Sequence, residues 1–576
     1  MSEKNSENPI LHVLVIGFHH KKGCQVEYAY PPFKNNEAGE PNECPIEWKH
    51  LPCQALPDGS HNFDEDTAYF HLPSLQNPNE TIYGISCYRQ IPLEKIINRT
   101  PDMTRSTIQK SVCVLSTLPL YGHIQVKMSL ITHAYFEEGD FSKITLLHDT
   151  YHHLNACLSS IENISTSPHL FVGLSAVELV TKFRHKVVLL FKLMLLERKV
   201  LFFYSPVRPL CSTILTLLSL HPGLVENGLK KSATVKPTHS TAVVFSVEQE
   251  EVVIPIVSSK LQKNNIPNTS VSENILLSSD TIDDDMVHVS SFACNIPRDP
   301  SIDSLNEAAM QYNMMSIAQI NSADCAVPLS IFDNGNICQP YSCLSYMDIL
   351  TDPSVRGYMI GASNILFKQK KNLADVIVEV DEGKVEIENV DLKRHLHLTT
   401  EDLRFADYLV RHVVQPEKED VFLDGVGWEG GDEWIRAQFK AYLLSLLRTS
   451  LLSEGAPELN HFNPSFMSAW QHTKSYQTWL NQDHQAIMAL EPCHPFAGQL
   501  SVSDMKLRIS HTMQSSESGR KLNQAVQNTS RAVASTGKVV GGAISQARGA
   551  VTNWWSNLTT TQDLENDKTK PPIQDV

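Results

Sequence analysis

Residues 11–32 contain two runs of strand-forming residues joined by a short polar turn. The first run, 11–18, is apolar throughout, whereas the second, 24–30, alternates more, and Pro31 and Pro32 end it. Gly23 lies in the connection, and the prolines cannot donate to a strand ladder. This pattern predicts a β-hairpin near the N-terminus, and a first strand that is apolar on both faces is typical of a buried, central position in a sheet.

The length and composition of the chain limit the classes of protein to which it can belong. A chain of 576 residues is too long for one core, so we expect about two to four domains. The net charge of −16 argues against nucleic-acid binding by the chain as a whole. The first ten residues lack the apolar core of a signal peptide, so we expect a cytosolic protein.

The cysteine pattern favours buried thiols over a metal site. The sequence has twelve cysteines and no CxxC pair. Five of them lie inside apolar patterns and are predicted to be buried: Cys24, Cys53, Cys87, Cys113 and Cys157. Glu65 and its neighbours Asp64 and Asp66 are interpreted as a solvated loop.

The most hydrophobic window, 187–204, is interrupted by charged residues. Lys192, Glu197, Arg198 and Lys199 leave no uncharged run near the roughly 20 residues of a membrane-spanning helix. We therefore predict a buried helix followed by a buried strand at 200–204.

Hydrophobic periodicity divides the chain into regions. Residues 9–168 alternate between strand-like and helical patterns, which indicates an α/β module. Its further elements are expected as strands at 81–88 and 109–116 and helices at 129–138 and 142–158.

The next region begins with a long helical pattern at 174–197, with Ser175 as its expected N-cap. A second helix is expected at 210–220. Residues 226–325 are rich in Ser, Thr, Asn and Asp and lose periodicity, which predicts a disordered insertion with one or two strands at 241–257.

Order is expected again from residue 326. A strand entering a short helix is predicted at 355–367 and a hairpin at 374–387. Helices follow at 400–414, 432–452 and 463–481, so this part is largely α-helical.

Local motifs for catalysis are weak. Residues 425–430 match GxGxxG, but Glu429, Asp432 and Glu433 surround the following helix start and would repel phosphate. We interpret the motif as a structural turn and keep a nucleotide-dependent enzyme as a remote alternative. There is no P-loop and no nucleophile–base arrangement in the local sequence, so no catalytic residue, cofactor or metal ligand is predicted.

Residues 503–560 form a distinct tail that is basic although the chain is acidic. Apolar residues recur there every three or four positions, and acids are absent from 518 to 562. Its glycines each disfavour a helix by about 1 kcal/mol, so the helix should form on a surface rather than in water. We predict reversible binding to a membrane surface, with sensitivity to lipid packing as a hypothesis; a partner-helix role or a flexible tail remain alternatives. The predicted membrane-binding residues are Leu522, Val526, Arg531, Val533, Lys538, Val540, Ile544, Val551, Trp554, Trp555 and Leu558.

A series of sequence blocks, taken in order, resembles the DENN-domain family, specifically its Avl-nine branch of late-secretory-pathway proteins. The blocks are LHVLVIGFHHKKGCQVEYAYPP (11–32), LPDGSHNFDEDTAYFHLP (56–73), YGISCYRQI (83–91), QKSVCVLSTLPLYG (109–122), LITHAYFEEGDFS (130–142), FRHKVVLLFKLMLLERKVLFFYSP (183–206), RGYMIGASNILF (356–367), DLRFADYLVRHV (402–413), GWEGGDEWIRAQF (427–439) and SVSDMKLRIS (501–510). Each block alone is a weak indication of the family, but the blocks together, in this order, are a specific one.

The resemblance implies a fold of class α/β plus α, built as a tripartite module. The expected divisions are a disordered N-terminus (1–8), a longin-like α/β lobe (9–168), a core α/β lobe (169–370) with the insertion at 226–325, a helical part (371–500), an amphipathic tail (501–560) and a disordered C-terminus (561–576).

The resemblance also implies a function in membrane trafficking, in late secretion or endosomal recycling, with a possible influence on cell migration or polarity through cargo delivery. The implied partner is a Rab-family small GTPase, gripped between the first two lobes so that its nucleotide exchanges, without acid–base residues. The protein would lie peripherally on Golgi-derived, secretory or recycling endosome membranes. A non-catalytic DENN scaffold is the alternative.

Overall fold

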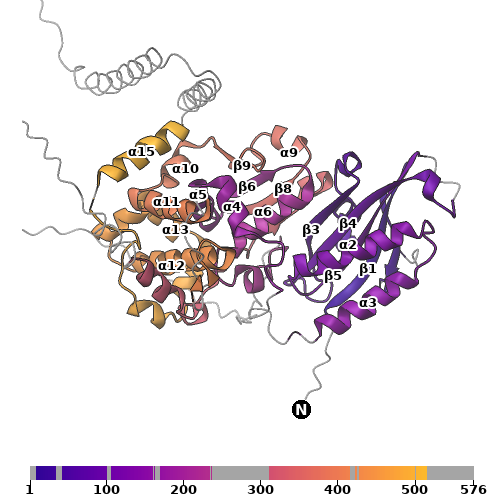
Figure 1. Cartoon of the computed structure of the whole chain (residues 1–576), viewed down its shortest axis with the longest axis horizontal. Coiled ribbons are helices and arrows are strands. Elements are labelled where there is room, and N and C mark those ends of the chain that lie inside the picture. The colour runs from indigo at the N-terminus through magenta and orange to yellow at the C-terminus, as the bar shows by residue number, and fades with distance from the viewer. Residues whose placement is uncertain are drawn as a thin grey trace, which may run out of the picture.

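The computed structural model describes residues 8–33, 42–99, 105–159, 161, 169–233, 235, 310–414, 422–423, 427–499 and 501–515. These residues form an elongated molecule with two sheet-containing lobes and a helical part (Figure 1). The first lobe lies at one end and the helical part at the other, with the second lobe between them.

The first lobe is built on a five-stranded antiparallel sheet in the order β2-β1-β5-β4-β3. Its strands are β1 (Ile10–His19), β2 (Gly23–Tyr30), β3 (Glu65–Pro73), β4 (Thr81–Pro92) and β5 (Thr107–Ser116). The predicted hairpin is confirmed, because β1 pairs with β2 and also with β5. Val13 to Ile16 of β1 are at most 1% exposed, as expected for a central strand.

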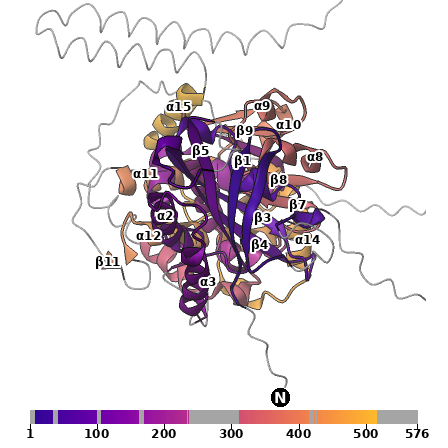
Figure 2. The ribbon, with the colours of Figure 1, turned by 90° about the vertical axis from the view of Figure 1, so that its right-hand side faces the viewer.

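Helices cover both faces of this sheet. One face packs on α2 (Tyr121–Glu137) and α3 (Thr145–Leu158) (Figure 2). The other face packs on the short α1 (Leu51–Ala55). The alternation of β1 explains this, since Val13 and Val15 belong to the first core and Leu14 and Ile16 to the second.

Several sequence predictions in this lobe need correction. Cys24 and Cys53, predicted to be buried, are only half-buried. Helix α2 starts at Tyr121 instead of residue 129; its second residue, Gly122, lies so close to the carbonyl of Val172 that a Cβ atom would clash. Cys157 is exposed and not buried, because the buried stripe of α3 runs through Leu154 and Leu158, and Cys157 lies off it.

The second lobe contains a mixed sheet in the order β10-β9-β6-β8-β7. Strands β6 (Lys199–Phe203), β7 (Asn336–Gln339), β8 (Gly357–Ala362) and β9 (Val376–Glu379) are parallel, and β10 (Lys384–Ile387) pairs antiparallel to β9. The strand at 200–204, the strand and short helix at 355–367 and the hairpin at 374–387 are thus confirmed.

The single long helix predicted at 174–197 is wrong. The chain forms α4 (Ala176–Phe183) and α5 (Lys186–Leu195), separated at Arg184, whose φ of 48° is outside the helical region. The predicted N-cap is confirmed, because the Ser175 hydroxyl accepts a hydrogen bond from the Glu178 N–H at 3.2 Å. Helix α6 (Val207–Ser219) follows β6.

Parts of the stretch expected as a disordered insertion are buried in the folded molecule, and the Cys325 carbonyl accepts a hydrogen bond from Nε1 of Trp479 in the helical part at 2.9 Å. Leu229 and Cys325 are fully buried, and Met314 is 1% exposed. The strands expected at 241–257 lie outside the described residues.

The helical part contains α10 (Val390–His395), α11 (Thr400–Val414), α12 (Asp432–Ser450), α13 (Pro464–Gln471), α14 (Lys474–Leu480) and α15 (Val502–Ser515). The helix predicted at 463–481 is two helices, and the Thr473 hydroxyl caps α14 by accepting from the Tyr476 N–H. No helix among the described residues is both long enough and apolar enough to cross a bilayer.

Candidate functional site at the junction of the two lobes

The edge strand β3 of the first lobe forms most of the junction with the second lobe. It contacts α6 and β7, and all its residues from Asp66 to Leu72 are buried. Gln339 of β7 exchanges hydrogen bonds with the backbone of His71, its Nε2 donating to the carbonyl at 3.0 Å. The edge of one sheet is therefore bound to the edge of the other by specific side chains.

His71 links the two lobes as a neutral imidazole. Its Nδ1 lies 2.8 Å from the Cys338 carbonyl and 2.9 Å from the Ser232 hydroxyl, both in the second lobe. Its Nε2 lies 2.7 Å from the hydroxyl of Tyr121 on α2. Complete burial lowers the pKa of His71 to about 3, so the ring is uncharged at neutral pH.

Asp66 joins the lobes at the start of α6. Its carboxylate accepts hydrogen bonds from the N–H groups of Val207 (2.8 Å) and Arg208 (3.0 Å), the first residues of that helix. The interpretation of 64–66 as a solvated loop is therefore wrong for Asp66, which is 8% exposed, although Glu65 remains exposed. Burial raises the pKa of Asp66, while these N–H groups oppose that shift.

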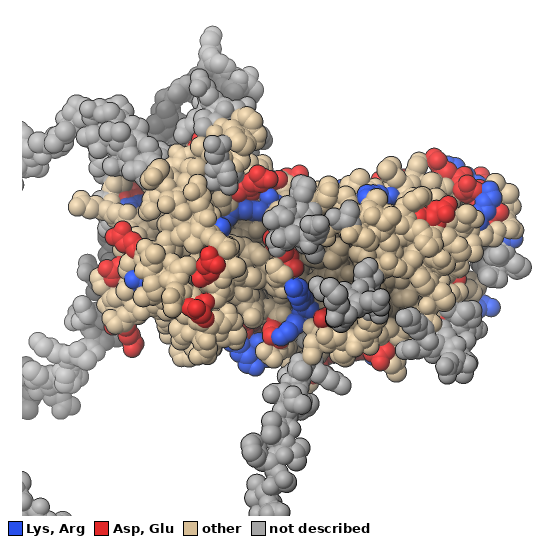
Figure 3. Space-filling view, turned by 90° about the horizontal axis from the view of Figure 1, so that it is seen from below, with Lys and Arg blue, Asp and Glu red and all other residues tan. Residues whose placement is uncertain are grey.

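A groove of about 220 Å³ lies beside this cap. Residues from both lobes line it: Phe63, Glu65, Asp66, Thr67, Cys87, Tyr88, Arg89, Ser129, Thr132, Pro206, Arg208 and Pro209. Side chains of both charge signs gather at the waist between the lobes on the face seen in Figure 3.

A charged network follows the rim of the groove. Arg89 lies 3.7 Å from the Glu65 carboxylate and also contacts His133 of α2. His133 in turn pairs with Glu137 at 2.8 Å. Arg208 of the second lobe is exposed on the opposite side of the groove.

Helix α2 presents apolar residues to solvent beside the groove. Val126 is 51% and Leu130 69% exposed, and they lie one turn apart, next to Ser129, which lines the groove. An exposed leucine and valine in one row, bordered by charged groups, are typical of the surface that a protein partner covers.

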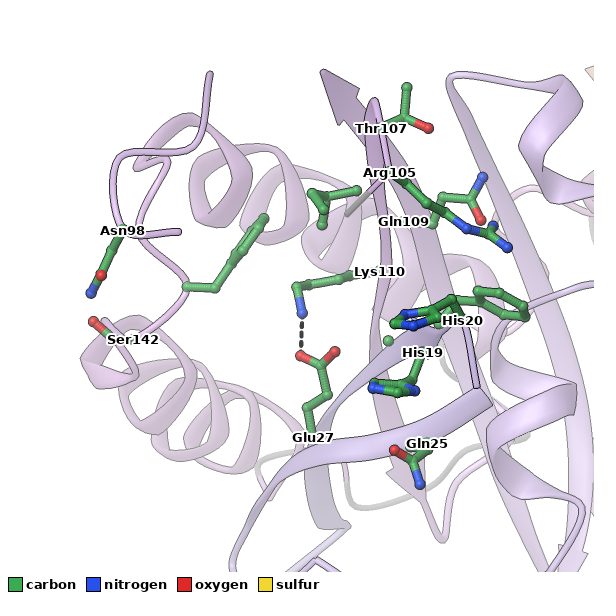
Figure 4. A pocket seen from close by; sticks show the side chains of 14 residues that line it. His19, His20, Gln25, Glu27, Asn98, Arg105, Thr107, Gln109, Lys110 and Ser142 are labelled. Carbon is green, nitrogen blue, oxygen red and sulfur yellow. Dashed lines mark hydrogen bonds and ion pairs between the residues drawn. The ribbon is translucent and has the colours of Figure 1, made fainter. Parts of the chain in front are cut away.

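A second hollow, of about 410 Å³, lies at the turn of the β1–β2 hairpin (Figure 4). His19, His20, Arg105 and Ser142 line it together with Lys110 and Glu27, which form an ion pair. Of the Lys, Arg, Asp and Glu side chains that line this hollow, only Arg105 lies outside this ion pair.

Neither hollow carries a reactive group. Burial raises the pKa of the Cys87 thiol to about 11, so it is protonated at neutral pH. Within the described part of the chain, no group of three or more His, Cys, Asp or Glu is arranged to hold a metal ion. The described residues at the lobe junction form a groove lined by polar and charged side chains, with an exposed apolar row on α2 beside it.

Among its described residues, 427–430, the GxGxxG match contains the short strand β12 (Gly427–Trp428) and then a turn before α12. Gly427 and Gly430 have φ of 87° and 79°, which favours glycine. Asp432 does not face a ligand, because its carboxylate accepts hydrogen bonds from the Val177 N–H and the Ser175 hydroxyl at the start of α4.

The predicted membrane-binding residues, Leu522 to Leu558, lie outside the described residues. The structure describes the start of the tail as α15, which is attached to the helical part. Arg404 donates two hydrogen bonds to the Asp504 carboxylate, both at 2.7 Å, and this ion pair holds the pKa of Asp504 well below its usual range.

Sequence reasoning missed the groove residues Asp66, Arg89 and Arg208 and the exposed row of Val126 and Leu130 beside them. Only the row on α2 left a signal in the sequence, since Val126, Leu130 and Ala134 recur every four residues. Because the helix was expected to start only at residue 129, Val126 lay outside it and the row was not recognised.

The described residues form two α/β lobes joined at a polar junction, with a helical part behind them, which defines a mixed α/β class of protein. The model of the transport protein Avl9 family matches residues 10–450. The chain therefore belongs to the Avl9 family of transport proteins.

Two yeast proteins are similar over most of this chain. The late secretory pathway protein avl9 of Schizosaccharomyces pombe is 25% identical over 514 residues, which cover 86% of this chain and 92% of that protein. The late secretory pathway protein AVL9 of Saccharomyces cerevisiae is 25% identical over 568 residues, covering 91% of this chain and 65% of that protein.

Proposed function

We propose that this protein is a DENN-type regulator of late secretory or recycling traffic that binds a Rab-family small GTPase at the lobe junction and promotes its nucleotide exchange. In this proposal the first lobe is longin-like and the second is the core DENN lobe. The observation that carries the proposal is that the groove and the exposed row on α2 adjoin each other where the two lobes meet.

The chemistry of the surface supports a protein partner. Stable interfaces bury roughly 800 Å² on each side, with an apolar centre and a polar rim. Val126 and Leu130 supply an apolar centre, and Arg89, His133 and Arg208 supply a rim. A GTPase held by both lobes would be positioned for opening of its nucleotide site without any acid–base group of this protein.

The test is release of fluorescent GDP from a panel of Rab proteins by the purified full chain. We expect faster release from at least one Rab, and loss of both release and binding in Val126→Asp/Leu130→Asp. Val390→Asp is the matched control, because Val390 is 77% exposed on α10 in the helical part.

Two outcomes separate the alternatives. Complex formation with a flat rate of GDP release would favour the non-catalytic scaffold. No binding to any Rab, or equal binding by the double variant and the wild type, would overturn the proposed surface.

The second element of the proposal is membrane attachment through the tail, from Leu522 to Leu558. Flotation of the full chain with small vesicles should fall when Trp554 and Trp555 are both changed to serine. Trp428→Ser is the control, since Trp428 is 56% exposed outside the tail. Equal flotation of the tail variant and the wild type would contradict this attachment.

A further inference from the structure

The segment that follows β8 presents two apolar side chains to solvent, at the start of the short helix α9 (Leu366–Gln369). Ile365 is 49% and Leu366 45% exposed, whereas the next residue, Phe367, is buried and anchors the segment. The Asn364 side chain fixes the start of α9, since its oxygen accepts a hydrogen bond from the Leu366 N–H at 3.1 Å. The fold therefore holds the two apolar side chains outward.

Positive charge accompanies this apolar pair. Residues 353–374 contain no acid, and Lys370 and Lys371 are exposed just after α9. The other lysine of this segment, Lys368, forms an ion pair with Glu379 of β9. Exposed apolar side chains next to lysines, whose long stems can lie along apolar surface, are typical of protein that contacts lipid headgroups.

Two further loops adjoin α9 at the carboxyl ends of the parallel strands. The turn after β9 packs so closely on the loop between α4 and α5 that a Cβ atom at Gly383 would clash with the Lys182 carbonyl. Lys186 donates to the Gly383 carbonyl at 2.6 Å. We call the three loops, residues 182–186, 364–372 and 380–384, the carboxyl edge.

The carboxyl edge is basic in a chain with a net charge of −16. Lys368 and Lys384 form ion pairs with Glu379 and Glu386. The other Lys, Arg, Asp and Glu side chains of the three loops are the bases Lys182, Arg184, Lys186, Lys370 and Lys371 and the acids Asp381 and Glu382. The excess of bases complements a negatively charged surface.

The helix that leads into the tail lies on the same side of the molecule. Two perpendicular views place α9, α10 and α15 along one side (Figure 1, Figure 2). Met505 is 61% and Ile509 37% exposed, one turn apart on α15. Next to these helices, the exposed acids and bases of 388–394 balance one another: Glu388, Asp391, Lys393 and Arg394. A flat partner on this side would contact α9 and α15 together.

We propose that the carboxyl edge is a contact surface for an anionic membrane. The inference rests on the proposed membrane attachment and adds to the tail a second contact on the folded part of the chain. Ile365 and Leu366 would enter the headgroup region, and Lys370 and Lys371 would face anionic headgroups. Two weak contacts on one chain bind more tightly than either alone, because the second forms within an already bound molecule.

This contact would also orient the molecule on the membrane. The Ser363 hydroxyl, just before the segment, donates to the Asp58 carbonyl of the first lobe at 3.1 Å, so α9 adjoins the lobe junction. A membrane held against α9 would keep that junction close to its surface. The tail alone does not do this, because it continues from α15 on the helical part.

The experiment is flotation of the full chain with phosphatidylcholine vesicles, with and without phosphatidylserine. We expect phosphatidylserine to increase binding of the wild type. Lys370→Gln/Lys371→Gln should lower the partition coefficient on the anionic vesicles about tenfold, because each lysine near such a surface contributes to the attraction. Lys21→Gln/Lys22→Gln is the matched control, since these two neighbouring lysines are also exposed but belong to the first lobe.

A second variant tests the apolar pair. Ile365→Ser/Leu366→Ser should lower binding to both kinds of vesicle, because less apolar surface then enters the headgroup region. Ile97→Ser is its control and should bind as the wild type does, since Ile97 is 78% exposed in the first lobe. Binding of the α9 variants equal to that of the wild type would overturn the inference, as would equal losses in the two lysine pairs.

Two comparisons separate this inference from the proposed function. Loss of flotation in Trp554→Ser/Trp555→Ser, with the α9 variants binding normally, would leave the tail as the attachment and overturn the second contact. Loss in the α9 variants alone would support the carboxyl edge and contradict the tail. GDP release from the Rab, measured without vesicles, should be unchanged in the α9 variants. Loss of that release with normal flotation would assign the carboxyl edge to the GTPase instead.

Discussion

The second lobe has two junctions, and they are built from different chemistry. Toward the first lobe it uses a neutral histidine, an amide and a carboxylate that caps a helix. Toward the helical part it uses a fully buried ion pair, in which Lys192 of α5 lies 2.7 Å from Asp402 of α11. An apolar core continues through both junctions, so the difference is in the polar contacts.

The buried ion pair has every partner that its burial requires. Asp402 also accepts from the Tyr442 hydroxyl at 2.7 Å and from the Thr399 N–H at 3.2 Å. Lys192 also donates to the Phe462 carbonyl at 3.0 Å. Burial by itself would raise the pKa of Asp402. The positive charge of Lys192 and the hydrogen bonds to the carboxylate outweigh this and hold the pKa well below its usual range.

The two junctions differ in how accessible their polar contacts are to solvent. The charges between the helical part and the second lobe are sealed from water. The polar contacts between the first and second lobes lie beside a groove and an exposed apolar row. The first junction therefore has a solvent-accessible surface beside it.

The largest expected effect is at the sealed junction. Asp402→Ala leaves the Lys192 ammonium buried without its counter-charge, so the free energy of unfolding should fall by about 3–5 kcal/mol. Urea unfolding measures this. The double variant Lys192→Met/Asp402→Leu should recover much of the loss, because no buried charge remains.

Asp391→Ala is the control for that experiment. It removes an ion pair with Arg394 whose side chains are 71% and 66% exposed, and should change stability by at most about 1 kcal/mol. A loss of that small size for Asp402→Ala as well would refute the distinction between the junctions.

The second effect is a pH dependence at the first junction. His71 has a pKa of about 3 when folded and about 6.5 when unfolded, so the unfolded state binds more protons between these values. The contribution of His71 to the free energy of unfolding is therefore at its full value above pH of about 6.5. Below that pH it falls by roughly 1.4 kcal/mol per pH unit. Urea unfolding at pH 7.5, 6.5 and 5.5 should show a smaller slope in His71→Gln than in the wild type.

Tyr121→Phe separates this titration from a general loss of packing. It removes the hydroxyl partner of Nε2 but leaves the imidazole, so stability should fall at every pH while the slope remains. Equal slopes in His71→Gln and the wild type would show that His71 does not carry the effect.

The strands could be predicted because their signal is local. The hairpin, β6 and the β9–β10 pair each combine an apolar or alternating run with a turn, and the structure confirms them. The breaks in predicted helices could not be found this way, because Arg184 adopts φ of 48° within an otherwise continuous apolar period. Periodicity reports which face is buried but not where the chain turns.

The groove could not be predicted, because its parts come from segments far apart in the sequence. Asp64, Glu65 and Asp66 form one acidic run, and only the structure shows that Asp66 reaches the N-terminus of α6, about 140 residues later, as a cap.

The third effect is the loss of that cap. Asp66→Ala leaves two N–H groups of α6 without their acceptor, so unfolding should require about 1–2 kcal/mol less. Asp64→Ala is the control, since Asp64 is exposed, and Asp66→Asn should retain part of the stability. Urea unfolding with equal losses at positions 64 and 66 would show that the cap does not support the junction.

The smallest expected effect tests whether the apolar row on α2, beside the first junction, is exposed to solvent. Leu130→Asp should change the free energy of unfolding by no more than about 0.5 kcal/mol, because Leu130 is 69% exposed. Met128→Asp on the same helix places a charge in the core and should be far more destabilising, since Met128 is fully buried. Urea unfolding compares them, and a loss above about 2 kcal/mol for Leu130→Asp would mean that this chain itself covers the row. A small loss would show that the fold of the first lobe does not need the Leu130 side chain, which is then accessible to a partner beside the groove.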